Sequence, residues 1–210
     1  MKNAIKKIFM GLCGFALAAS MSCGLARSDS SNVQIGYNTR AKALTTRIES
    51  NGELSDRLSY YGFLDADATQ ESPADLESFY GELRLMTPVT DALCLAAEYN
   101  GGNSMEDLVR LGVGYSPRLG ENNFTFLKFY PVETSGKKGM QFSVYSRQKL
   151  GSRLNASLWA DWDISQSMLL CEPELEYRLG NGLIGYTRAK GVVGDKFSFT
   201  PIVGCKYEFH

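Results

Sequence analysis

The last fourteen residues of the chain, FSFTPIVGCKYEFH (residues 197–210), carry the clearest fold signal in the sequence. Read at every second position, one side carries Phe197, Phe199, Pro201, Val203, Cys205, Tyr207 and Phe209, and the other carries Ser198, Thr200, Ile202, Gly204, Lys206 and Glu208. Successive side chains of a strand point to opposite faces, so this alternation indicates a β-strand. Strands of globular proteins are typically about 5–6 residues long. The segment therefore predicts an unusually long strand with one apolar and one polar face.

The first 26 residues have the three parts of a secretory signal peptide. Three lysines occur among the first seven residues, an apolar run follows over 8–19, and small residues end the segment at Ala26. The run is too short to span a membrane comfortably, and its small-residue end fits a cleavage site. The sequence therefore predicts a signal peptide over 1–26, cleaved after Ala26, and one mature domain over 27–210. The alternative is lipidation at Cys23, although Ser20 is not the aliphatic residue usual three positions before it.

Charge and cysteine content argue against several kinds of partner and site. Without the three lysines of 1–26, 19 basic residues face 23 acidic ones, and a net charge of −4 argues against a nucleic-acid partner. Of the five cysteines, three lie outside 1–26, and these scattered residues, Cys94, Cys171 and Cys205, do not form a disulfide framework. The only histidine is the last residue, His210, so we expect no metal site, no cofactor and no histidine-based catalysis. The chain is not expected to be an enzyme.

The mature domain is predicted to consist of alternating segments separated by turn-rich connectors. No stretch shows a sustained apolar period of 3.6 residues, so helix is at most a minor component. Twelve strands are expected, at 33–39, 42–49, 57–67, 77–87, 91–100, 107–116, 123–132, 139–148, 152–163, 168–179, 182–190 and 195–209. One long bent strand over 33–49 is an alternative to the first two. Compact connectors such as SNGELSD alternate with longer, more charged ones such as ATQESPADLE, as in outer-membrane barrels.

Strand length and aromatic placement separate two environments that alternation alone does not. Polar and apolar residues alternate along the strands both in a secreted β-sandwich with one solvated face and in a membrane barrel with a water-filled lumen. The expected strands reach the ~9–11 residues that a tilted membrane strand requires. Aromatic residues such as Tyr115 and Tyr177 also occur near strand ends. These features predict an all-β, antiparallel up-and-down transmembrane β-barrel of about 12 strands in the bacterial outer membrane. A soluble secreted β-sandwich is the alternative.

The order of several short signatures resembles the nucleoside-specific channel superfamily of outer-membrane proteins, the Tsx-like porins. The matching stretches are VQIGYN (33–38), RLSYYGFLDAD (57–67), SFYGELRL (78–85), LAAEYNGG (95–102), LLCEPELEYRLGNGLIGY (169–186) and FTPIVGCKYEF (199–209). The resemblance implies a twelve-stranded barrel and passive passage of nucleosides or similar small solutes. The chain is shorter than is usual for such a channel and carries His210 beyond the terminal phenylalanine.

The predicted wet face combines aromatic rings with charged groups. Aromatic rings stack on flat bases and sugars, and charges orient polar edges, so these side chains are the candidates for contact with a solute. The candidates are Tyr61, Phe63, Asp65, Tyr80, Glu82, Arg84, Glu98, Arg110, Tyr145, Arg147, Trp159, Asp161, Glu172 and Glu174. The alternative interpretation is that they fill a narrow barrel and stabilise it. Carboxylates two residues apart are interpreted as parts of one solvated strand face, since residues i and i+2 of a strand point to the same side.

Function is predicted from this combination of barrel and lumen. We expect a passive channel for nucleosides or other small polar solutes, with outer-membrane lipid around it. The aromatic last strand is the part that barrel-assembly machinery would recognise. Two alternatives remain, a closed structural or adhesive barrel without transport and the soluble secreted β-sandwich.

Overall fold

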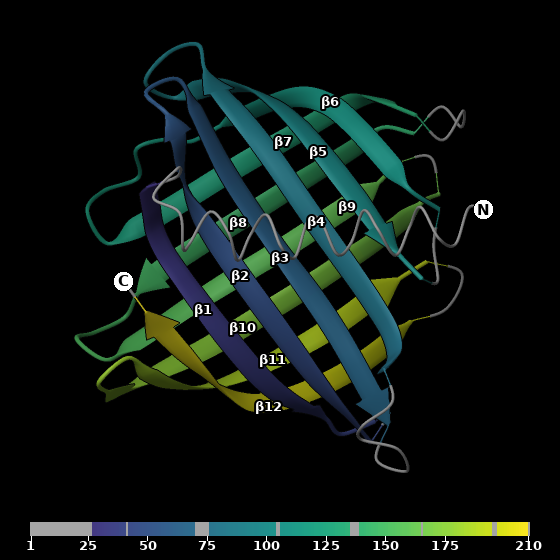
Figure 1. Cartoon of the computed structure of the whole chain (residues 1–210), viewed down its shortest axis with the longest axis vertical. Coiled ribbons are helices and arrows are strands. Elements are labelled where there is room, and N and C mark those ends of the chain that lie inside the picture. Colours follow the sequence, from purple (N-terminus) through teal and green to yellow (C-terminus); the bar gives the residue numbers. More distant parts are fainter. Residues whose placement is uncertain are drawn as a thin grey trace.

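The computed structural model describes residues 27–40, 42–69, 76–103, 106–134, 139–164, 166–194 and 197–209. The predictions for the signal peptide (1–26) and for His210 lie outside these residues. The described chain forms twelve strands (Figure 1): β1 (Arg27–Asn38), β2 (Ala43–Ser55), β3 (Leu58–Thr69), β4 (Leu76–Pro88), β5 (Leu93–Gly102), β6 (Leu108–Tyr115), β7 (Asn123–Glu133), β8 (Gln141–Lys149), β9 (Leu154–Asp163), β10 (Met168–Gly180), β11 (Leu183–Val193) and β12 (Ser198–Phe209). No helix within the described ranges is long and apolar enough to cross a membrane.

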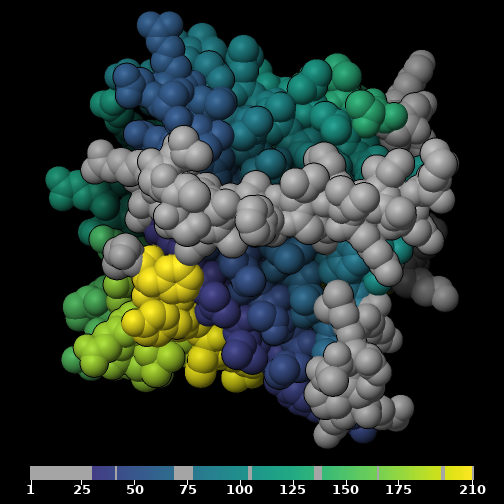
Figure 2. Space-filling model, in the orientation of Figure 1, coloured from purple at the N-terminus to yellow at the C-terminus, as the bar shows by residue number. Residues whose placement is uncertain are grey.

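The twelve strands form one closed antiparallel barrel. Each strand pairs with its neighbours in sequence, and β1 pairs with β12 from Ser31↔Phe209 to Asn38↔Ile202. Figure 2 shows the result on the surface, where the yellow C-terminal strand lies beside the purple N-terminal strand. Closure pairs the two edge strands with each other over 31–38 and 202–209, so the backbone groups that an open sheet would expose there are satisfied. The predicted barrel is confirmed, and the alternative of a β-sandwich is wrong because a sandwich consists of two packed sheets.

The barrel has an apolar outer face and a polar inner face. In β12, Phe199, Val203 and Tyr207 point outward, and Val203 is 57% exposed. Lys206, on the other side of the same strand, is 6% exposed and points inward. Soluble proteins bury their apolar side chains, whereas a band of outward apolar residues is typical of membrane barrels. The two faces read from the last strand are therefore confirmed.

The first two predicted strands are separate, and both are longer than the sequence pattern indicated. β1 and β2 form a hairpin that pairs Val33 with Ile48 and Tyr37 with Leu44, so the alternative of one bent strand is wrong. β2 continues to Ser55, although SNGELSD was expected to be a turn. Both neighbouring strands supply ladder partners to this segment, which stabilise turn-favouring residues such as Asn51 in a strand.

The two ends of the barrel carry different sets of connectors. We call the end at which Arg27 and Phe209 lie the terminal end. It also carries the connectors β2–β3, β4–β5, β6–β7, β8–β9 and β10–β11. The opposite end is called the distal end. The strand bounds leave two to seven residues for each terminal-end connector and four to seven for each distal one, so the expected difference in length is present but small.

Pro173 occupies an interruption in the ladder between two strands. β10 pairs with β11 at Cys171↔Gly191 and again at Glu174↔Arg188, with no pair at the two positions between. On its other side β10 continues its pairs with β9 through Pro173↔Leu158. Proline has no backbone N–H to donate, so this interruption accommodates it within the barrel wall.

Candidate functional site

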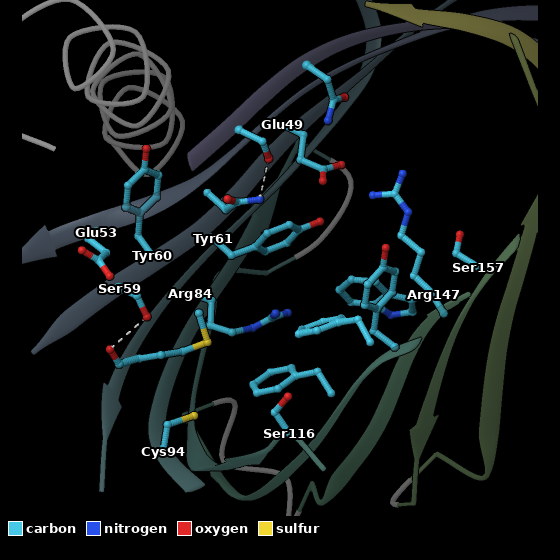
Figure 3. A pocket seen from close by; sticks show the side chains of 18 of the residues that line it. Glu49, Glu53, Ser59, Tyr60, Tyr61, Arg84, Cys94, Ser116, Arg147 and Ser157 are labelled. Atoms are coloured by element: carbon cyan, nitrogen blue, oxygen red, sulfur yellow. Dashed lines mark hydrogen bonds between the residues drawn. The ribbon is translucent and has the colours of Figure 1, made fainter. Parts of the chain in front are cut away.

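A cavity of about 690 Å³ occupies part of the barrel interior and reaches the terminal end. Its rim includes Asp56 and Arg57 of the β2–β3 turn and Asp91 of the β4–β5 turn. Figure 3 shows Tyr61 and Arg84 pointing into this space from one wall, and Arg147 and Ser157 from the other. Its volume is within the ~300–1,000 Å³ typical of small-molecule sites.

The strand register places all fourteen predicted candidates on the inward face. Half of them line the cavity: Tyr61, Arg84, Tyr145, Arg147, Trp159, Glu172 and Glu174. The others belong to side-chain networks beyond the cavity lining: Phe63, Asp65, Tyr80, Glu82, Glu98, Arg110 and Asp161. Contact between any of them and a solute stays a prediction.

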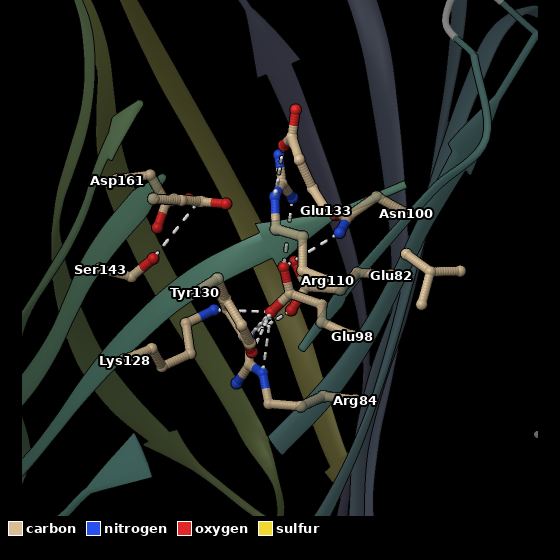
Figure 4. Close-up of polar contacts among 12 residues, drawn as sticks. Glu82, Arg84, Glu98, Asn100, Arg110, Lys128, Tyr130, Glu133, Ser143 and Asp161 are labelled. Atoms are coloured by element: carbon tan, nitrogen blue, oxygen red, sulfur yellow. Dashed lines mark hydrogen bonds and ion pairs between the residues drawn. The ribbon is translucent and has the colours of Figure 1, made fainter. Parts of the chain in front are cut away.

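Glu98 is the centre of the first network, which we call the Glu98 network (Figure 4). One carboxylate oxygen accepts hydrogen bonds from Lys128 Nζ at 2.8 Å, Tyr130 Oη at 2.9 Å and Arg84 Nε at 3.0 Å. The other oxygen accepts one from Asn100 Nδ2 at 2.9 Å. Glu98 is 1% exposed, so its charge is stable there only because cations and donors surround it.

The Glu98 network extends along the neighbouring strands. Arg84 also pairs with Glu82, and Arg110 Nη1 lies 3.4 Å from Glu98 Oε1. The members therefore come from β4, β5, β6 and β7, which are consecutive around the barrel. A network of this density rigidifies the wall that it covers.

A second network lies across the strands near the barrel closure. Glu174 on β10 accepts hydrogen bonds from Arg188 Nε at 2.7 Å and Lys206 Nζ at 3.0 Å. Lys206 also binds Glu176, and Arg188 Nη2 donates to Gln34 Oε1 at 2.9 Å. This network links β10, β11, β12 and β1, so it connects the last strands of the chain to the first.

A bidentate ion pair lies between β2 and β3. Arg47 Nε and Nη2 donate to the two carboxylate oxygens of Asp65 at 2.6 and 2.7 Å. The guanidinium carbon of Arg47 also lies 4.3 Å from the centre of the Phe63 ring. This geometry fixes Arg47 more firmly than a single ion pair would.

Six inward aromatic residues form a continuous chain of ring contacts. The centroid distances are 6.0 Å for Phe124–Tyr145, 5.8 Å for Tyr145–Trp159, 6.2 Å for Trp159–Tyr61, 6.1 Å for Tyr61–Phe63 and 5.6 Å for Phe63–Tyr80. Phe124, Tyr145, Trp159 and Tyr61 also line the cavity. The arrangement can bind a flat solute through stacking, while the charged groups nearby bind its polar edge.

Sequence reasoning missed several of the side chains that organise the lumen. Lys128, Tyr130, Arg47 and Arg188 were not among the candidates, although each has a central contact. A detectable signal did exist for Lys128, the one charged residue within the apolar run FTFLKFY. A lysine inside a membrane strand is expected to point to the lumen, since the lipid face costs about 2–4 kcal/mol.

Comparison with known proteins identifies the class of fold. No family model matches the chain, and no curated protein matches it. Among solved structures, the NanC porin superposes with a TM-score of 0.60 at 9% identity, covering 84% of this chain and 98% of the porin. The KdgM porin superposes with a TM-score of 0.59 at 11% identity, covering 86% and 99%. A second KdgM structure, in complex with disordered oligogalacturonate, has a TM-score of 0.58 at 11% identity, with the same coverage.

The fold is therefore that of outer-membrane porins. At 9–11% identity, the likeness extends to the architecture of the barrel and not to the solute. The resemblance to the nucleoside-specific channels is not confirmed by these comparisons.

Proposed function

We propose that this protein is a passive channel of the bacterial outer membrane for small polar solutes. The observation that carries the proposal is the cavity of about 690 Å³ inside a closed barrel whose outer face is apolar. The porin-like architecture supports it. Planar-bilayer recording tests it, with discrete conductance steps as the expected result and a silent bilayer containing folded protein as the contradicting one.

The lining of the cavity favours uncharged solutes with a flat ring, of which nucleosides are one example. Four aromatic residues of the ring chain line the cavity, and such rings stack on bases and sugars. The same lining contains six basic residues (Arg47, Arg57, Arg84, Arg147, Arg188, Lys206) and eight acidic ones (Glu49, Glu53, Asp56, Asp91, Glu172, Glu174, Glu176, Glu208). An acidic excess does not attract a polyanion such as the oligogalacturonate found with KdgM.

Liposome swelling distinguishes these solute classes. Vesicles containing the protein are expected to swell faster in uridine or in a neutral monosaccharide than in galacturonate oligomers. Faster swelling with the acidic oligomers would contradict the proposed preference. A preference for uridine over sugars of similar size would support the nucleoside assignment.

A closed structural barrel is the second candidate, and one specific observation favours it. The rings of Tyr61 and Trp159 meet inside the lumen, and the side chains of the Glu98 network occupy the lumen beside them. A barrel with these contacts fixed would not conduct. Absence of swelling with every small solute, from protein that is folded in the vesicles, would favour this candidate over the channel.

Location and maturation are also part of the proposal. Cleavage after Ala26 followed by insertion into the outer membrane fits the signal-peptide pattern of 1–26 and the apolar outer face. The mass of the mature protein tests this against lipidation at Cys23. Recognition by barrel-assembly machinery through β12 is tested by Phe209→Ser, which is expected to lower the amount of folded barrel in the outer membrane.

A further inference from the structure

Tyr61 and Trp159 make a contact across the full width of the lumen. Tyr61 lies on β3 and Trp159 on β9, which are six places apart in both directions around the twelve-stranded barrel. Their ring centroids are nevertheless 6.2 Å apart. The guanidinium carbon of Arg84 lies 5.0 Å from the Tyr61 ring and 5.6 Å from the Trp159 ring, so it joins both. We call these three side chains the cross-lumen contact.

Near the terminal end, Met86 of β4, Phe126 of β7 and Tyr145 of β8 also line the cavity. Farther in, the contact separates two parts of the lumen, and one of them is filled by side chains. On the side of β4 to β8, Tyr130 is 0% exposed and Ser143 is 1% exposed, although both point inward. Lys128 joins this packing to the contact, because its Nζ lies 4.9 Å from the centre of the Trp159 ring. Tyr130, Ser143 and Lys128 lie outside the lining of the cavity.

The other part of the lumen contains the deep end of the cavity. Its wall comes from β1, β2 and β10 to β12, and includes Gln34, Arg47, Glu172 and Arg188. The cavity therefore reaches the middle of the barrel along this wall, opposite the filled part. The deep end of the cavity therefore has aromatic rings on the side of the cross-lumen contact and charged groups on the opposite wall.

We infer that the cross-lumen contact is the constriction of the channel and that solutes pass it only on the side of Arg47, Glu172 and Arg188. This inference rests on the proposed channel function and specifies its route. A ring-shaped solute in this gap turns its flat face to Trp159 and Tyr61. Its hydroxyl or amide edge then reaches the charged groups of β2, β10 and β11.

Removing the ring of Trp159 tests the constriction. Trp159→Ala is expected to raise the single-channel conductance by about twofold or more, because conductance follows the narrowest part of a pore. Trp162→Ala is the matched control: it removes the chain's other tryptophan, which lies on the same strand, points outward and is 50% exposed. Heat-modifiable migration on gels verifies that each variant is folded.

The outcomes separate this inference from the proposed function. Conductance in the wild type that Trp159→Ala leaves unchanged would overturn the constriction and leave the channel intact. A silent wild type with a conducting Trp159→Ala variant would support the constriction and contradict an open channel. Silence in both would overturn both.

Thiol labelling tests, without any conductance, which part of the lumen is open to solutes, and it also serves if Trp159→Ala does not fold. Two inward serines form a matched pair: Ser157 on β9 lines the cavity, and Ser143 on β8 lies in the filled part. Each is changed to cysteine in a chain whose native cysteines are serine. A charged, membrane-impermeant thiol reagent is expected to label Ser157→Cys and to leave Ser143→Cys unlabelled. Labelling of Ser143→Cys, or of neither, would overturn the inferred route.

Discussion

Gly36 and Gly204 lie opposite each other where the first and last strands close the barrel. A Cβ on Gly204 would lie 2.2 Å from the carbonyl oxygen of Ile35 and 2.8 Å from the Cα of Gly36. The ring of Tyr186, on the adjacent strand β11, covers both glycines: its hydroxyl oxygen lies 2.5 Å from a Cβ placed on Gly36, and its Cζ lies 2.8 Å from one on Gly204. The seam therefore has no room for a side chain at either glycine.

Gly204→Ala is expected to impair closure of the barrel. The added methyl group meets backbone atoms, which cannot move without disturbing the β1–β12 pairs. Gly191→Ala on β11 is the control, because the nearest atom to its Cβ is at an ordinary distance of 3.5 Å. Heat-modifiable migration measures the folded fraction. Equal folded fractions for the two variants would contradict the importance of the seam.

Glu98→Gln is expected to lower the stability of the barrel. The change leaves Lys128 and Arg84 buried without the carboxylate that both bind, and removing one partner of a buried ion pair costs about 3–5 kcal/mol. Glu121→Gln in the exposed connector 116–122 is the control. The midpoint of unfolding in urea, in detergent or vesicles, measures the effect. Similar midpoints for both variants would show that the network adds little.

The two tryptophans are expected to respond differently to brominated lipids. Trp162 points outward and Trp159 lies in the lumen, where its Nε1 donates to Asp161 at 2.7 Å. Bromine on acyl chains quenches only nearby indole rings. The variant Trp159→Phe, which keeps Trp162, should lose most of its fluorescence, whereas Trp162→Phe should lose little. Equal quenching, or the reverse order, would contradict the assignment of the outer face to lipid.

Lysine substitutions at adjacent positions of β9 are expected to have opposite tolerance. Leu158 points outward and Ser157 points into the cavity, opposite Glu174 in the neighbouring strand. A lysine on the lipid face at mid-membrane costs about 2–4 kcal/mol, so Leu158→Lys should reduce the folded fraction. Ser157→Lys should fold, since its ammonium group meets water and carboxylates. Folding yields into vesicles that are equal for the two variants would contradict this.

Much of the architecture could be predicted because each strand shows its alternation of apolar and polar residues in its own sequence. The alternation of Phe199, Val203 and Tyr207 with Lys206 follows from the strand period, and the structure keeps it. The bounds of β2 could not be predicted in the same way. Asn51 and Gly52 favour turns locally, and only the ladders to β1 and β3 extend the strand through them.

The candidate site was predictable as a face but not as a set of contacts. Tyr61, Arg84 and Trp159 were identified as lumen residues because they lie on the polar side of the strand alternation. Which of them meet depends on barrel closure, because closure sets the strand order around the wall and brings β3 opposite β9. The contacts of Lys128 and Tyr130 could not be predicted, because their partner, Glu98, lies thirty or more positions earlier in the sequence.

The sequence by itself determined that the chain forms long amphipathic strands with an apolar outer face, since residue period and side-chain polarity are local properties. The tertiary structure alone decided how the lumen is occupied. Opposite walls bring Tyr61 and Trp159 together, fill one part around Glu98, and leave the cavity on the other. The physical reason is that a long side chain can meet the opposite wall only after ring closure has set the width of the barrel.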